Sequence, residues 1–266
     1  MPEKPDHISL FYVDYVSREI KVGDLLVGGN NPVRIQSMTN TSTSDVPATV
    51  NQIKQLVSAG CDIVRLAVQN KKEAEILPVI KRELKKSGIA IPLVADIHFR
   101  PEFAEIAARY VEKVRINPGN YIDRQRGKTD YTEMDDELAL ERISERLRPL
   151  IEICKREGTA IRIGVNHGSL SERILIKYGN TPEGMVESAM EFIRVCRREG
   201  FDNLTLSLKA SHVLTMIEAN RMFVERMKAR GYDYPVHLGV TEAGSGEEAR
   251  MKSITGIGSL LASGIG

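Results

Sequence analysis

The sequence predicts an α/β fold, a TIM (β/α)8 barrel that begins with a β-hairpin and is truncated before or at its eighth strand. Short apolar segments alternate with helical patterns through most of the 266 residues. Each apolar segment ends in polar or charged residues, as barrel strands do at the end that carries a site. The length suits a single barrel, because barrels of this kind commonly contain about 250 residues.

The N-terminal part, residues 1–30, has a different pattern. Apolar and polar residues alternate between Ile8 and Gly29, around Ser17–Glu19 and Gly23–Asp24. This alternation predicts short antiparallel strands. We expect them to form a hairpin that covers the bottom of the barrel, while residues 31–266 form the substrate-binding barrel domain.

Seven later segments are rich in Val, Ile and Leu, which is typical of parallel strands buried on both faces. The candidate strands are Val33–Gln36, Ile63–Val68, Pro92–Ala95, Lys113–Ile116, Ala160–Val165, Leu204–Leu208 and Val236–Val240. A seven-stranded barrel would leave unpaired edges, which are costly. We therefore expect the chain to be a fragment, or the eighth strand to come from a missing domain or partner.

Helical patterns separate these strands. The candidate helices are Val46–Ala59, Lys72–Lys86, Pro101–Arg109, Asp136–Glu157, Thr181–Glu199, Val213–Arg230 and Glu247–Ala262. Thr181 and Pro182 form a start signal, with a hydroxyl at the N-cap and proline at the first helical position. Glycine follows several of the helices, at Gly60, Gly158 and Gly200, which is a stop signal.

Composition excludes several classes of protein. The net charge of +1 gives no general attraction to nucleic acid or an anionic membrane. No apolar run is long enough to cross a bilayer, and the start lacks a secretory pattern, so we expect a cytoplasmic protein. Cys61, Cys154 and Cys196 are widely spaced. They predict buried, reduced thiols rather than a disulfide framework or a metal or cluster site made by this chain alone.

Four cations lie in or at the ends of the strand segments: Arg65, Arg115, Arg162 and Lys209. A charge in an apolar strand is expensive to bury without a partner. Each could pair with a carboxylate inside the barrel as a structural ion pair. Four cations at matching positions favour instead a multiply charged anion. The fit of arginine forks to phosphate oxygens indicates that this anion is phosphorylated.

Asp96 and His98 follow another strand, and alternation places them on the same side of an extended segment. An acid beside a histidine can fix its tautomer, raise its pKa or bind a metal with it. The alternatives are an Asp that caps the next helix and a His bonded to the backbone. The position of the pair favours a functional role.

Polar residues also follow two of the later strands. Asn166 lies near an expected helix start, which suits an anion. Thr241 and Glu242 follow the seventh strand, and Glu242 is the best-placed candidate for general acid–base work. Its alternative role is to hold Lys209 or an arginine. Lys209 could also form a Schiff base, as in aldolase barrels.

Together these residues resemble one family, the (E)-4-hydroxy-3-methylbut-2-enyl diphosphate synthases of the non-mevalonate isoprenoid pathway. The matching segments, from about Pro32 onward, are Gln36–Thr41, Val94–Phe99, Arg115–Asn120, Arg162–Leu170, Ser207–Ser211 and His237–Gly244. The loop at Tyr121–Tyr131 and the Asn166–Gly168 segment resemble the larger, plant-type form, in which an inserted domain would lie beyond Gly266.

The resemblance implies an N-terminal TIM barrel that binds 2-C-methyl-D-erythritol 2,4-cyclodiphosphate, and a separate C-terminal domain with a [4Fe–4S] cluster. It implies reductive ring opening and dehydration with electrons from ferredoxin or flavodoxin, in a homodimer. By position, diphosphate ligands would be Arg65, Arg115, Arg162, Asn166 and Lys209. Further substrate contacts would be Asp96, His98 and Thr241, and Glu242 would be the acid–base residue.

The chain also departs from the family, because the cluster cysteines have no counterparts in it. We therefore expect no cofactor to be bound by this chain alone, and the isolated chain to be inactive as a reductase. The alternatives are a cluster-free barrel enzyme, either a Schiff-base aldolase or a pterin-binding synthase, and a non-catalytic assembly module whose charged mouth meets another chain.

Overall fold

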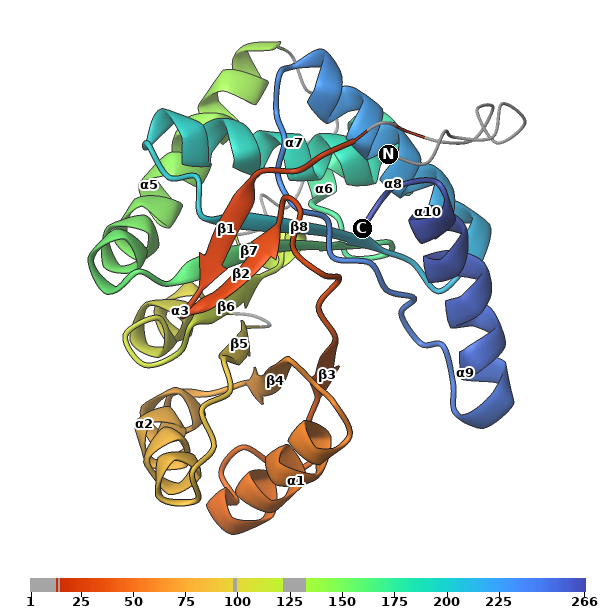
Figure 1. Cartoon of the computed structure of the whole chain (residues 1–266). Helices are drawn as coiled ribbons and strands as arrows, with labels where there is room; N and C mark the ends of the chain where they lie inside the picture. The colour runs from red at the N-terminus through yellow and green to blue at the C-terminus, as the bar shows by residue number, and fades with distance from the viewer. Residues whose placement is uncertain (1–12, 14, 98–99, 122–132) are drawn as a thin grey trace.

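The computed structural model describes residue 13 and residues 15–97, 100–121 and 133–266, apart from the side chains of residues 133–135. Within them a curled parallel sheet carries helices on its outer face (Figure 1). Its strands, in spatial order, are β3 (Gln36–Met38), β4 (Ile63–Val68), β5 (Leu93–Ile97), β6 (Lys113–Ile116), β7 (Ala160–Asn166) and β8 (Leu204–Lys209). This order, with each strand beside the next in the chain, confirms the predicted truncated barrel.

The predicted N-terminal hairpin is also confirmed. β1 (Glu19–Val22) and β2 (Leu25–Gly28) pair antiparallel, and Gly23 in their turn has a left-handed φ of 63°. Ile20 and Val22 pack against Ala160, the first residue of β7. Because that residue opens its strand, the hairpin contacts the N-terminal end of the sheet. The division of the chain into two domains stays a prediction.

The helices follow the predicted order, with small differences at their ends. They are α1 (Val46–Ser58), α2 (Lys71–Lys86), α3 (Pro101–Ala107), α4 (Pro118–Tyr121), α5 (Glu133–Glu157), α6 (Glu172–Tyr178), α7 (Pro182–Arg198), α8 (Val213–Ala229), α9 (Gly246–Ser253) and α10 (Ser259–Ala262). The predicted helix 247–262 is confirmed as one helical stretch, and a π-helical turn at Ile254–Gly258 within it joins α9 to α10. The short helices α4 and α6 were not predicted.

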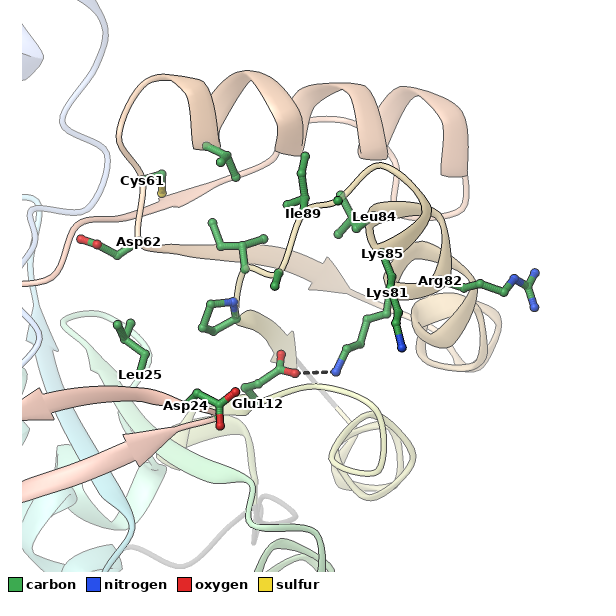
Figure 2. A pocket seen from close by; sticks show the side chains of 16 residues that line it. Asp24, Leu25, Cys61, Asp62, Lys81, Arg82, Leu84, Lys85, Ile89 and Glu112 are labelled. Atoms are coloured by element: carbon green, nitrogen blue, oxygen red, sulfur yellow. Dashed lines mark hydrogen bonds and ion pairs between the residues drawn. The ribbon is translucent and has the colours of Figure 1, made fainter.

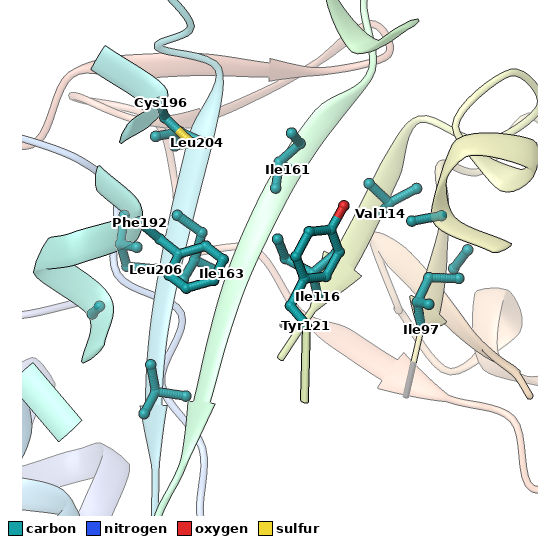
Figure 3. Close-up of a cluster of buried hydrophobic side chains, with 14 of the residues drawn as sticks. Ile97, Val114, Ile116, Tyr121, Ile161, Ile163, Phe192, Cys196, Leu204 and Leu206 are labelled. Carbon is teal, nitrogen blue, oxygen red and sulfur yellow. The ribbon is translucent and has the colours of Figure 1, made fainter. Parts of the chain in front are cut away.

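The apolar core lies between the strands and the helices. Ile161 and Ile163 of β7 are fully buried, and they lie with Phe192 of α7 and Tyr121 in one cluster (Figure 3). These strand residues alternate with Arg162 and Gly164, so the apolar side chains face the helices and the polar positions face the barrel interior. The alternation thus separates the stabilising core from the candidate site.

The sheet is open along one side. Segment 235–241 runs beside β8, with hydrogen bonds from His237 N to Leu206 O (2.7 Å) and from Thr241 N to Ala210 O (3.1 Å). The predicted strand Val236–Val240 was nevertheless wrong as a regular strand, since it forms a single bridge, at Val236, among the described residues. Among the described residues, this segment has a neighbouring strand on one side only. Half of its backbone groups therefore lack the inter-strand hydrogen bonds that keep a strand regular.

The opposite edge of the opening is β3. It spans Gln36–Met38 rather than the predicted Val33–Gln36, and Val33 and Ile35 are 63% and 61% exposed. A cavity of about 470 Å³ lies between this edge and segment 235–241. Gly266 also lines it. The opening therefore has the place of an eighth strand, and its walls are partly apolar.

A larger cleft, of about 830 Å³, lies at the N-terminal end of the sheet (Figure 2). Lys81 pairs there with Glu112, and Cys61 lines its wall.

The sequence predicted that all three cysteines are buried. This prediction is wrong for Cys61, which is half-buried because it precedes β4 at this open end. Cys154 and Cys196 are buried, as predicted, and burial raises the pKa of both thiols.

In the described part of the chain, no helix combines the length and the apolar character needed to cross a membrane.

Candidate active site

Four inward-facing polar residues form a row across neighbouring strands. Asp96 of β5 is in register with Arg115 of β6, Arg115 with Arg162 of β7, and Arg162 with Thr205 of β8. All four side chains are buried. Parallel pairing in register therefore collects charges that are far apart in the sequence at one level of the barrel interior.

Asp96 holds two of the predicted ligands. Its carboxylate lies 3.0 Å from Nη1 of Arg115 and 3.5 Å from Nε of Arg65. Nη2 of Arg115 donates to the carbonyl of Gly164 at 2.9 Å. In the amide orientation that satisfies both of its atoms, Asn166 accepts from the same nitrogen at 3.2 Å. For Arg65 and Arg115, the structural ion pair considered from the sequence is therefore present.

Arg162 is different. It is 1% exposed, and its Nε and Nη1 have no hydrogen-bond partner among the described residues. Burial and the nearby charges of Arg65 and Arg115 lower the pKa of its guanidinium. Buried donors without partners are costly, so they mark a place where a ligand or ordered water completes the site. An anion is the ligand that suits unpaired guanidinium donors.

Lys209 ends β8 and points across the neighbouring segment. A Cβ built at Gly239 would lie 2.6 Å from its Nζ, so the amine lies directly over this glycine. Burial lowers the pKa of Lys209 well below its usual range, and Arg162, Arg65 and Arg115 lower it further. The amine therefore belongs to the same cationic cluster as the predicted arginines.

Sequence reasoning missed two members of this cluster, Lys113 and His237. Lys113 is 2% exposed, and burial, with the charges of Arg162 and Arg65, lowers its pKa to about 7. His237 is half-buried, and burial and the same cations lower its pKa well below the usual range. Strand alternation could have identified both residues. Lys113 lies two residues before Arg115, and His237 lies two before Gly239, so each shares a face of its extended segment with that residue.

Lys113 should make stability depend on pH. Its pKa falls from 10.5 in the unfolded chain to about 7 in the fold, so between these values the unfolded chain binds the extra proton. The free energy of unfolding from this residue should therefore rise with pH across that window, by about 1.4 kcal/mol per pH unit. Denaturant titrations at several pH values should show a flatter dependence in Lys113→Met than in the wild type. Equal slopes would contradict a deprotonated Lys113.

Thr241 and Glu242 follow the segment beside β8. The bond from Thr241 N to Ala210 O places them at the same end of the barrel as Lys209 and Asn166. Glu242 is exposed and has a left-handed φ of 53°, an uncommon backbone conformation for a residue with a side chain. Such strain gathers at functional sites. His98 and the loop segment 122–131 lie outside the described residues.

Within the described ranges, no group of three or more His, Cys, Asp and Glu side chains has the arrangement of a metal site.

A family model, the GcpE TIM-barrel domain, matches residues 17–266. The chain belongs to the GcpE TIM-barrel family. The match includes both the hairpin and the strands that carry the cationic cluster.

Curated relatives of this GcpE barrel share about half of its residues. It is 54% identical over 251 residues to a protein from Leptospira interrogans named 4-hydroxy-3-methylbut-2-en-1-yl diphosphate synthase (flavodoxin). It is 51% identical over 258 residues to a protein of the same name from Akkermansia muciniphila. These alignments cover 94% and 96% of the chain but only 38% and 44% of the relatives. The chain therefore spans less than half the length of these relatives.

Solved structures with similar folds have low sequence identity to the GcpE barrel. A sialic acid synthetase from Leptospira borgpetersenii superposes with a TM-score of 0.54 at 15% identity, over 92% of this chain and 77% of that one. A dihydropteroate synthase from Thermus thermophilus gives 0.52 at 14% identity, over 92% and 89%. At such identities the likeness concerns the fold alone, and it agrees with a barrel.

Proposed function

We propose that this chain is the substrate-binding barrel of a 4-hydroxy-3-methylbut-2-enyl diphosphate synthase. The single observation that carries the proposal is the buried guanidinium of Arg162, which lies inside a cluster of cations and has two nitrogens without a hydrogen-bond partner among the described residues. Arg65 and Arg115 share one carboxylate, and Lys209 and Lys113 add further basic groups. A cyclic diphosphate would supply the negative charge that these residues attract.

The whole enzyme would open the ring of 2-C-methyl-D-erythritol 2,4-cyclodiphosphate reductively and remove its hydroxyl as water. This change consumes an electron pair and the protons that form the water. The names of the relatives support flavodoxin as the electron donor. A [4Fe–4S] cluster in the rest of the enzyme would supply the redox chemistry. The homodimer and the cytoplasmic location also stay predictions.

The residues of this chain would bind and orient the substrate. Arg65, Arg115, Arg162, Asn166 and Lys209 would hold the diphosphate, which fixes the reacting carbon relative to the mouth of the barrel. Thr241, Asp96 and His98 would make further substrate contacts. Glu242, at the mouth, would move a proton to the departing hydroxyl. Donors already held in place before the substrate arrives stabilise developing charge with little reorganisation.

The alternative cluster-free enzymes draw less support. A lowered pKa for Lys209 also suits an aldolase lysine. The family model, however, matches the chain from the hairpin to its last residue. The relatives named as diphosphate synthases share about half of its residues. These matches favour a barrel that binds a diphosphate over a Schiff-base enzyme, a pterin-binding synthase or an assembly module.

Isothermal titration of the 266-residue chain with the cyclodiphosphate tests the proposal. We expect saturable binding whose affinity falls as the salt concentration rises, because salt screens the attraction between the cations and the anion. The same chain with an artificial electron donor should show no turnover, since the cluster that would pass electrons to the substrate is proposed to lie in the rest of the enzyme. Absence of binding would refute the proposed diphosphate site. Turnover would refute the proposal that the redox chemistry needs the rest of the enzyme. Arg82→Ala, which changes an exposed arginine of α2, should bind like the wild type.

A further inference from the structure

Two glycines of the barrel interior lie directly under cationic side chains. A Cβ at Gly239 would lie 2.6 Å from Nζ and 2.8 Å from Cε of Lys209. A Cβ at Gly164 would lie 2.3 Å from Nε of Arg115. Non-bonded heavy atoms of this kind are most stable at about 3.5–4 Å. Each cation therefore occupies space that any other residue at the glycine position would fill.

The two pairs have the same geometry. Arg115 of β6 leans over Gly164 of β7, and Lys209 of β8 leans over Gly239 of segment 235–241. In each pair the cation and the glycine belong to neighbouring elements of the barrel. Backbone conformation does not explain Gly239, since it is not among the glycines with a left-handed φ. The requirement for glycine there comes from the lysine.

We propose that Gly239 is a positioning residue: its missing side chain leaves the space in which the Lys209 amine lies, and so sets where this cation meets the anion. The inference rests on the proposed diphosphate site and adds to it. It assigns no contact with substrate to Gly239 itself. The glycine acts through Lys209, which the site already contains.

The two positions should respond differently to alanine. Arg115 is pinned by Asp96 and by the Gly164 carbonyl, so a methyl group at 164 would strain a buried ion pair. The atoms that Gly239 faces are the far end of a flexible lysine. Gly239→Ala should therefore move the amine at little cost to the fold, which separates a positioning effect from a structural one.

Pyrophosphate titration of four proteins tests the proposal: wild type, Gly239→Ala, Lys209→Ala and the double variant. We expect Gly239→Ala to weaken binding about ten-fold, the size of one charge-assisted hydrogen bond. In the Lys209→Ala background the same substitution should have no further effect, because the displaced group is gone. Gly258→Ala, whose Cβ would meet nothing within 4 Å, should bind like the wild type.

A second measurement reports on the amine without a ligand. The pH dependence of Lys209 acylation, followed by peptide mass spectrometry, should shift to higher pH in Gly239→Ala as the amine leaves the cluster. Thermal unfolding should change little. Unchanged affinity and an unchanged acylation profile in Gly239→Ala would overturn the proposal, and so would a loss that is equal in both backgrounds. Failure of the wild type to bind pyrophosphate would refute the diphosphate site, while the acylation profile would still test Gly239.

Discussion

Arg162→Met is expected to weaken pyrophosphate binding about 100-fold, because hydrogen bonds to charged groups are worth roughly 1.5–3 kcal/mol. The same change should raise the thermal unfolding temperature. Arg162 is 1% exposed, and two of its nitrogens have no partner among the described residues. Replacing buried ion pairs or triads by apolar groups of similar volume is often neutral or stabilises a protein by about 1–4 kcal/mol, and a buried guanidinium with unsatisfied donors should follow the same direction. Function and stability should thus change in opposite directions.

Isothermal titration and a thermal melt of the same preparation measure both effects. Arg82→Met, at an exposed position of α2, provides the matched control and should leave both values unchanged. A gain of a few degrees is expected for a chain of this size. A variant that both unfolds earlier and binds normally would contradict the assignment of Arg162 as an unpaired anion ligand.

Asp96→Asn is expected to have the largest effect on the fold. The Asp96 carboxylate pairs with Arg65 and Arg115, and it is 2% exposed. Removing its charge would leave two guanidinium groups in an apolar interior, beside Arg162 and Lys209. Breaking a buried ion pair by removal of one partner costs about 3–5 kcal/mol. The midpoint of unfolding should fall by roughly 6–12 °C for about 3 kcal/mol.

Denaturant titration measures this loss, with Glu248→Gln as the control. Glu248 pairs with Lys252 on the surface of α9, where its side chain is 67% exposed. An exposed pair of this kind contributes between 0 and about 1 kcal/mol. Bound pyrophosphate should recover part of the stability of Asp96→Asn, because it would supply the missing negative charge. A loss below about 1 kcal/mol would show that water already solvates these arginines.

These two expectations have a common origin in the charge of the barrel interior. Arg162 and Asp96 lie at the same level of neighbouring strands, with Arg115 between them in register. Removing a cation relieves the cluster, and removing the carboxylate aggravates it. On the proposed function, a bound multiply charged anion is therefore expected to contribute to the stability of the fold.

Much of the fold follows from local patterns. Runs of Val, Ile and Leu predicted the positions of strands β4 to β8, and glycines after helices predicted where several helices end. The polar strand ends also predicted that Arg65, Asp96, Arg115, Arg162 and Lys209 gather in one place. Their convergence needs only the period of a strand and the common direction of parallel strands. Roles for these residues in catalysis or binding stay predictions.

Other properties depend on contacts between distant residues. Asp96 lies 19 positions from Arg115, and Gly164 lies 49 positions from the same arginine. No pattern within one strand reveals that Arg115 pairs with Asp96, or that two nitrogens of Arg162 have no hydrogen-bond partner among the described residues. The predicted strand 236–240 likewise became irregular because a strand is held by its neighbours, and one side of this segment has none among the described residues.

The sequence by itself determined the barrel, the order of its strands and the set of cations at its mouth, because alternation and chain direction are properties of each segment. Only the tertiary structure decided that two nitrogens of Arg162 have no partner among the described residues, that Lys113 and His237 belong to the cluster, and that Gly239 makes room for Lys209. Pairing, burial and steric room arise between strands, at distances of a few ångströms that no single segment contains.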